Sequence, residues 1–141
     1  MRIVLETNVL VSGLLSPFGP PGEIVRMVSS SDLRLCFDAR ILAEYADVLA
    51  RPKFGFDEDA VGALLDYIGH AGDAVAPVPL QAGLPDPFDE PFLEVALAGA
   101  ASCLVTGNLV HYPKHLRQGV SVLSPSEFVG ELRAGVSGGG T

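Results

Sequence analysis

Five short apolar runs along the chain have the pattern of buried β-strands. Each run is bounded by polar residues, glycine or proline, and none alternates between apolar and polar side chains. Strands that are apolar throughout are typical of a parallel sheet covered on both faces. The predicted strands cover residues 3–5, 33–37, 74–78, 102–105 and 120–123.

Apolar residues at helical spacing separate these runs. The predicted helices cover residues 21–28, 39–49, 57–68, 92–100 and a last segment from 125 onward. Asp38 has the character of a helix N-cap, and Ser124 with Glu127 three residues later predicts a capping box. Because strands alternate with helices, the sequence predicts an α/β fold in three layers, with a four- to five-stranded parallel sheet between helices.

The length of 141 residues fits one domain. We expect this domain to span residues 1–134 and the glycine-rich segment 135–141 to be a disordered tail. The apolar runs are shorter than the ~18 residues that a membrane span needs, and Glu6 interrupts the first of them where a signal peptide would be apolar. We therefore expect a cytoplasmic protein without membrane contact.

Composition limits the ways in which this chain could bind a partner. The net charge of -8 and the isoelectric point near 4.6 argue against a broad basic surface for nucleic acid. They leave a cation-binding cluster of carboxylates open. Cys36 and Cys103 lie in apolar segments without a second cysteine or histidine at zinc spacing, so we expect both to be reduced core residues.

Acidic and amide side chains follow the predicted strands, where an open parallel sheet binds its ligands. Converging carboxylates repel one another unless a cation lies between them, and oxygen ligands suit Mg²⁺ or Mn²⁺. The candidate ligands at these positions are Glu6, Glu44, Asp86, Asp89, Glu90 and Asn108.

The same residues also have a purely structural interpretation. Asp86, Asp89 and Glu90 have the positions of helix caps, and Asn8 could cap the helix that follows the first strand. The hydroxyl-bearing residues at the strand ends are equally typical of turns. If the metal site exists, these neighbours would orient its ligands: Thr7, Asn8, Asp86 and Thr106.

The segment 111–117 is a basic cluster that follows Asn108 closely in the sequence. His111, Lys114 and Arg117 could contact phosphates, and Tyr112 could stack on a base. A solvated loop face is the alternative interpretation. Pro113 separates His111 from the next histidine, so these residues lack the spacing of a metal pair on a continuous helix.

Four segments in order resemble the PIN domain family, and more closely its small prokaryotic branch described as toxins of toxin–antitoxin systems. The segments are MRIVLETNVLVSGLL, ILAEYADVLARPKF, LPDPFDEPFLEVALAGAASCLVTGN and GVSVLSPSEFV. They cover about residues 1–132. The resemblance implies a PIN-like sheet and a ribonuclease that depends on Mg²⁺ or Mn²⁺. It also implies a possible antitoxin partner and a homodimer.

The resemblance assigns roles to individual positions. The DTN-like motif is Glu6-Thr7-Asn8, the helix acid is Glu44, the third acid is Asp89, with Asp86 before it, and the late motif is Thr106-Gly107-Asn108. Glu6 stands where aspartate is usual, and Asn108 where aspartate is common. The longer acid displaces its oxygens and the amide removes a charge, so we expect one firmly bound ion at most.

Two functions follow from this pattern. The first is cleavage of single-stranded RNA, with Glu6, Glu44 and Asp89 as catalytic ligands of the metal and a water as nucleophile. The second is a catalytically weakened PIN-like module that binds RNA or protein, which the departures at Glu6 and Asn108 favour. A phosphoacceptor receiver domain fits the sequence poorly because no lysine follows the strand at 102–105. An aspartyl phosphatase also fits poorly, because it needs a DxD motif after the first strand and this chain has Glu6-Thr7-Asn8 there.

Overall fold

The computed structural model describes the backbone of residues 1–139 and the side chains of residues 1–135. Five parallel strands form one sheet in the order β3-β2-β1-β4-β5. The predicted α/β fold with a parallel sheet is therefore confirmed. The strands are β1 (Arg2–Leu5), β2 (Arg34–Phe37), β3 (Asp73–Ala74), β4 (Leu104–Val105) and β5 (Val122–Leu123).

Within residues 1–139, six α-helices and four short 3-10 helices connect and cover these strands. The α-helices are α1 (Thr7–Leu15), α2 (Pro20–Ser29), α3 (Ala39–Leu49), α4 (Glu58–Ala71), α5 (Glu90–Ala98) and α6 (Pro125–Gly139). The 3-10 helices are η1 (Pro52–Phe54), η2 (Pro87–Asp89), η3 (Leu109–His111) and η4 (Lys114–Leu116).

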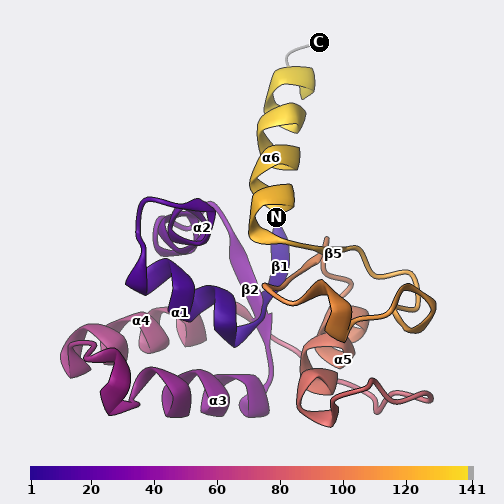
Figure 1. Cartoon of the computed structure of the whole chain (residues 1–141), viewed down its shortest axis with the longest axis horizontal. Helices are drawn as coiled ribbons and strands as arrows, with labels where there is room; N and C mark the ends of the chain where they lie inside the picture. The colour runs from indigo at the N-terminus through magenta and orange to yellow at the C-terminus, as the bar shows by residue number, and fades with distance from the viewer. Residues whose placement is uncertain (140–141) are drawn as a thin grey trace.

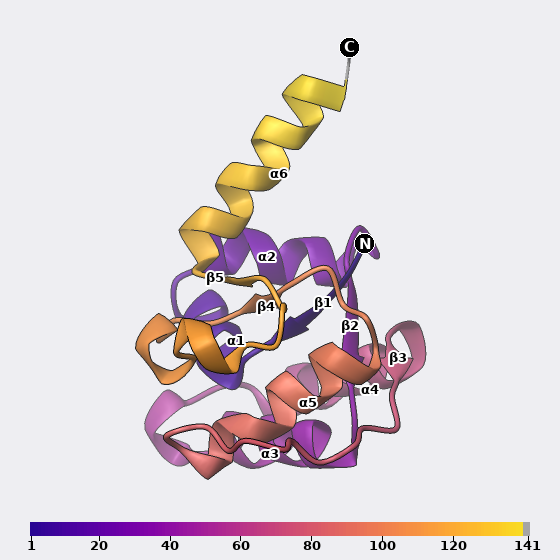
Figure 2. The same ribbon diagram turned by 90° about the vertical axis from the view of Figure 1, so that its right-hand side faces the viewer.

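The sheet lies between two helical layers. Helix α5 packs against β1 and β2 on one face, and α1, α2 and α4 lie on the other (Figures 1 and 2). Because both faces are covered, the central strands are apolar where they are buried: Ile3, Val4 and Leu5 are fully buried, as are Leu104 and Val105. No helix in residues 1–139 is both long and apolar enough to span a membrane.

Local signals in the sequence mark several element boundaries correctly. The Asp38 carboxylate accepts a hydrogen bond from the Ile41 backbone N–H at 3.0 Å, which is the predicted N-cap of α3. The capping box before α6 is also present: the Glu127 N–H donates to the Ser124 hydroxyl, and the Ser124 N–H donates to the Glu127 carboxylate. Cys36 and Cys103 are buried and unbridged, as expected.

Three boundaries differ from the expectation. The third strand is only Asp73–Ala74, so the predicted run at 74–78 is mostly loop. Residues 7–15 are helical from Thr7, with Glu6 and not Asn8 at the N-cap position. Helix α6 continues to Gly139, which places residues 135–139 of the expected tail in helical backbone, while residues 140–141 lie outside the described part of the chain. Figures 1 and 2 show α6 projecting from the body of the protein.

Candidate metal site at the carboxyl end of the sheet

Two central strands end side by side and bring their following residues together. Leu5 of β1 is in register with Val105 of β4, so Glu6 and Thr106 leave the sheet as neighbours. The Glu6 N–H still donates to the Val105 carbonyl at 3.0 Å. The position of Glu6 is therefore fixed by the sheet, at the edge where parallel strands present ligands.

The Glu6 carboxylate is buried and held by two side chains. Only 6% of Glu6 is exposed. The Tyr112 hydroxyl donates to Oε2 at 2.8 Å, and the Asn8 amide donates to Oε1 at 3.2 Å. Tyr112 is itself completely buried, so it orients the acid and cannot stack on a base as the sequence suggested.

A second buried carboxylate, Asp89, reaches the same place from the turn before α5. It is also 6% exposed and makes no side-chain cap bond to α5. Its Oδ2 lies 3.1 Å from Nδ1 of His111, yet neither atom has a hydrogen-bond partner and both are shielded from solvent. Buried polar atoms without partners are rare in proteins, and they are a usual sign of a missing ion or water.

Burial raises the pKa of both carboxyl groups. For Glu6, loss of solvent is the largest cause and the charge of Asp89 adds to it, whereas the hydroxyls of Thr106 and Tyr112 oppose the rise. For Asp89, loss of solvent again dominates the raised pKa, and His111 opposes it. Two acids with raised pKa values at one point favour a cation between them.

The donor atoms of Glu6, Asp89 and His111 lie within 4.8 Å of one another. Metal–ligand distances of about 2.0 to 2.2 Å hold two ligands at most about 4 Å apart, so small side-chain rotations that bring these donor atoms closer together would let one ion contact all three. The buried, unpartnered Oδ2 of Asp89 supports the same conclusion. The residues present therefore fit a divalent metal ion.

The PIN domain family model matches residues 2–110, which is most of the chain. This chain belongs to the PIN domain family. No curated protein matches the sequence. PIN domains are a nuclease-like family whose members generally use divalent metals, which agrees with the chemistry of the buried carboxylates. The matched range contains Glu6, Glu44, Asp89 and Asn108 and ends one residue before His111.

Glu44 of this PIN domain does not belong to the group of donor atoms formed by Glu6, Asp89 and His111. Its carboxylate, on α3, is half-buried and accepts a hydrogen bond from the Thr7 hydroxyl. Among the described residues, the group of donor atoms within 4.8 Å contains Glu6 and Asp89 but not Glu44. Thr7 is the residue that follows Glu6, so its hydrogen bond holds the helix acid Glu44 near the group of Glu6, Asp89 and His111.

The late motif of the PIN domain forms a tight turn against the early one. The Asn8 side-chain carbonyl accepts a hydrogen bond from the Gly107 N–H at 3.1 Å, and the Thr106 hydroxyl accepts one from the Asn108 N–H at 3.0 Å. The Asn108 side chain is exposed. Asn8 thus contacts both Glu6 and Gly107, so it fastens the two motifs together and is not a helix cap.

The acids around Asp89 have structural contacts of their own. Asp86 accepts a hydrogen bond from the Phe88 N–H at 3.0 Å and so caps η2. Glu90 accepts one from the Leu84 N–H at 2.9 Å. The structural interpretation of the acidic loop therefore holds for these two residues, whereas Asp89 makes no such bond.

The basic segment divides into an inner and an outer part. His111 is turned inward against Asp89, although its sequence spacing gave no sign of a metal site. Lys114 is exposed, and Arg117 is half-buried with its Nε donating to the Tyr112 carbonyl at 2.8 Å. Lys114 is thus the member of the predicted phosphate contacts that is most open to solvent.

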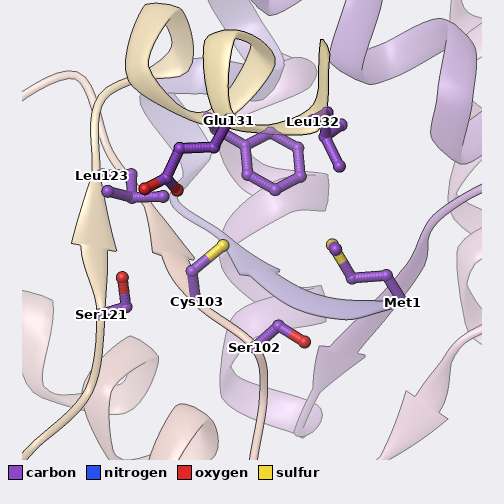
Figure 3. Close-up of a pocket in the computed structure, with 8 residues that line it drawn as sticks. Met1, Ser102, Cys103, Ser121, Leu123, Glu131 and Leu132 are labelled. Carbon is purple, nitrogen blue, oxygen red and sulfur yellow. The ribbon is translucent and has the colours of Figure 1, made fainter. Parts of the chain in front are cut away.

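A pocket at the opposite, amino end of the sheet has a different character. Its volume is about 130 Å³, and its lining includes Met1, Ser102, Cys103, Glu131 and Leu132. Figure 3 shows the Cys103 sulfur pointing toward the helix that carries Glu131 and Leu132. Burial and the nearby Glu131 charge raise the pKa of the Cys103 thiol to about 12, so it stays protonated and is a poor nucleophile.

Proposed function

We propose that this PIN domain is a metal-dependent ribonuclease that cleaves single-stranded RNA by attack of water on a phosphodiester. The observation that carries the proposal is the pair Glu6 and Asp89, both buried, both with raised pKa, and with Oδ2 of Asp89 lacking a hydrogen-bond partner. Such a pair is unfavourable in an empty site and favourable around Mg²⁺ or Mn²⁺.

Each residue has a distinct role in this proposal. Glu6 and Asp89 hold the ion, and Glu44 and Asn108 extend the ligand set toward the solvent side. When bound, a divalent cation lowers the pKa of water and neutralises charge on the phosphate. Tyr112 and Asn8 fix the direction of the Glu6 oxygens through hydrogen bonds of 2.8 and 3.2 Å. Thr7 restrains Glu44 in the same way.

The basic segment supplies the contacts that bring RNA to an acidic protein. No aspartate or glutamate occurs between Gly107 and Ser126, and Lys114 and Arg117 lie in this stretch. A local positive segment beside the site can attract the phosphate backbone even though the net charge is -8.

The proposal extends to the biological setting through the resemblance of the four sequence segments. We infer a cytoplasmic toxin of a toxin–antitoxin pair that acts as a homodimer. Expression of the chain should arrest growth, and co-expression of a neighbouring gene product should relieve the arrest. Light scattering after gel filtration should give about twice the mass of 14.7 kDa. A monomer mass, or growth unaffected by expression, would count against this setting.

The second candidate function is a PIN-like module that binds without cutting. The observation that favours it is the longer acid at Glu6 together with the uncharged, exposed Asn108. Shortening the acid in Glu6→Asp should then create or increase cleavage. This outcome would separate a weakened nuclease from an active one.

The deciding experiment is cleavage of a labelled single-stranded RNA with Mn²⁺ and with Mg²⁺. The chain is compared with Glu6→Asp and Asp89→Asn, and with Asp66→Asn, an exposed acid on α4, as the matched control. We expect cleavage by the chain and by the control, and none by Asp89→Asn. Cleavage by Asp89→Asn at the normal rate would refute the metal assignment, and cleavage only by Glu6→Asp would support the binding module.

A further inference from the structure

His111 lies in the metal site, although the spacing of histidines in the sequence did not predict this position. It ends η3, and its Nδ1 lies 3.1 Å from Oδ2 of Asp89. Both atoms are buried, and neither makes a hydrogen bond. The side chain of Asp89 is 9% exposed. The contact is an ion pair only when the imidazole is protonated; otherwise two buried polar atoms without a hydrogen bond are costly unless an ion or a water lies beside them.

We infer that His111 is a ligand of the metal, so that the inner donor set consists of Glu6, Asp89 and His111, two carboxylates and one imidazole, with Glu44 and Asn108 outside it. The donor atoms of these residues lie within 4.8 Å of one another. This inference rests on the proposed function for its biological meaning, but it concerns metal binding and can be tested without RNA.

The loop around His111 holds the imidazole in place before any ion binds. The His111 N–H donates to the Asn108 carbonyl, and the Tyr112 N–H donates to the Leu109 carbonyl, both at 3.0 Å. The next side chain, Tyr112, is anchored to Glu6 at 2.8 Å. Because the residue after His111 is bonded to one ligand and the His111 ring lies against the other, the imidazole is preorganised for coordination.

His111 also compensates for the amide in the late motif. Asn108 has no charge and its side chain is exposed, so it is a weak third ligand. His111 follows three residues later and points into the site. Its Nδ1 is shielded from solvent, although 40% of the side chain is exposed.

The donor set determines which ion the site prefers. Carboxylates suit Mg²⁺ and Mn²⁺ alike, whereas imidazole favours first-row transition ions and contributes little to Mg²⁺ binding. A site of two carboxylates and one imidazole should therefore bind Mn²⁺ more tightly than Mg²⁺, and the difference should depend on His111.

Calorimetric titration of the metal-free protein with Mn²⁺ and with Mg²⁺ tests this dependence. Loss of a residue that only orients a metal ligand weakens metal binding about tenfold or more. Loss of a direct ligand should weaken it at least as much. We expect His111→Asn to reduce the Mn²⁺ affinity by at least about tenfold and to leave Mg²⁺ within about threefold. His111→Asp should raise the Mg²⁺ affinity above that of the parent chain. His115→Asn, an exposed histidine four residues on, should change neither.

A second measurement needs no variant and so does not depend on a variant folding. Pulsed electron paramagnetic resonance of the Mn²⁺-loaded parent chain should show the coupling of a directly bound imidazole nitrogen. The absence of nitrogen coupling, or Mn²⁺ binding that His111→Asn leaves unchanged, would overturn the inference. Nitrogen coupling in a chain that cuts no RNA would uphold the metal site and refute only the nuclease.

Discussion

Among the side chains that the structure describes, this PIN domain has two pairs of buried carboxylates, and they differ in one respect. Asp38 and Glu94 are 9% and 7% exposed, and the Arg40 guanidinium bridges them at 2.7 and 2.8 Å. Backbone N–H groups of Ile41 and Leu80 occupy the remaining oxygens. All four oxygens of this pair therefore have partners.

The pair Glu6 and Asp89 is buried to the same degree, but no lysine or arginine of the described residues pairs with it, and the basic group in contact is the His111 ring, 3.1 Å from Asp89. The donors that reach Glu6 are a hydroxyl and an amide, and Oδ2 of Asp89 has none. The pKa of both acids is raised, chiefly by burial. A carboxylate pair with its own cation holds the fold together, whereas a pair without one is prepared for a cation from solution.

The largest expected effect separates the two pairs by activity. Glu6→Gln removes one of the two carboxylate charges of the pair Glu6 and Asp89. The metal site then loses several kcal/mol of charge stabilisation, and each 1.4 kcal/mol, about the value of a tenfold change in rate, slows the reaction tenfold. RNA cleavage should therefore fall at least about 100-fold. Glu94→Gln should change the rate per folded molecule by less than about twofold. Initial rates on labelled RNA at saturating Mn²⁺ measure both variants. An equal loss of cleavage rate in Glu6→Gln and Glu94→Gln would contradict the proposed difference between the two carboxylate pairs.

The next effect separates the pairs by stability. Arg40→Gln leaves Asp38 and Glu94 buried without their cation, which should lower the free energy of unfolding by about 2 kcal/mol. The value is below that of a fully buried pair because the Arg40 side chain is 48% exposed. Urea unfolding followed by circular dichroism measures it. Arg51→Gln, which removes a surface pair with Asp47, is the control and should cost less than about 0.5 kcal/mol.

A smaller effect concerns pH. Since the folded pKa values of Glu6 and Asp89 are raised, the folded state holds their protons more tightly than the unfolded chain does. Their contribution to stability is present below the ordinary carboxyl range near pH 4, and it is lost as the pH rises through the raised values. In EDTA, Asp89→Asn should therefore gain stability relative to the parent chain as the pH rises. Thermal unfolding from pH 4.5 to pH 8 measures the difference.

Metal ions should reverse this trend in the parent chain alone. Mn²⁺ competes with protons for the two carboxylates, so the increase in melting temperature on adding Mn²⁺ should be larger at pH 7.5 than at pH 5. Asp89→Asn should show little increase at either pH. A melting temperature of the parent chain that Mn²⁺ leaves unchanged at pH 7.5 would contradict the difference between the two carboxylate pairs.

The smallest effect concerns a cation outside both pairs. Lys114 is exposed on the segment beside the site, so Lys114→Ala should weaken RNA binding several-fold and leave both carboxylate pairs intact. The slope of log affinity against log salt concentration should decrease by about 0.7, as expected for one lost phosphate contact on a single strand. Fluorescence anisotropy with a labelled RNA between 50 and 200 mM salt, about the usual working range, measures it. Lys53→Ala, after α3, is the matched control.

Local spacing determined much of the fold. The Asp38 cap and the Ser124 to Glu127 capping box each close within three residues, so neighbouring letters suffice to predict them. The strand β3 was placed less well, because a run of two paired residues leaves almost no periodicity to detect. The PIN-like motifs likewise identified Glu6, Glu44 and Asp89 as candidates from short segments of sequence.

Only the tertiary structure decided how these candidates are partnered. Tyr112 and Glu6 are 106 residues apart, and their hydrogen bond depends on the register of β1 with β4 and on the path of η3. The same path turns His111 toward Asp89, whereas the sequence suggested that His111 and Tyr112 lie in a basic loop facing RNA. The sequence by itself determined the acids and the sheet that presents them. Which acids have a cation and which lack one was decided by contacts between distant segments, because charge pairing depends on distance in space and not on separation along the chain.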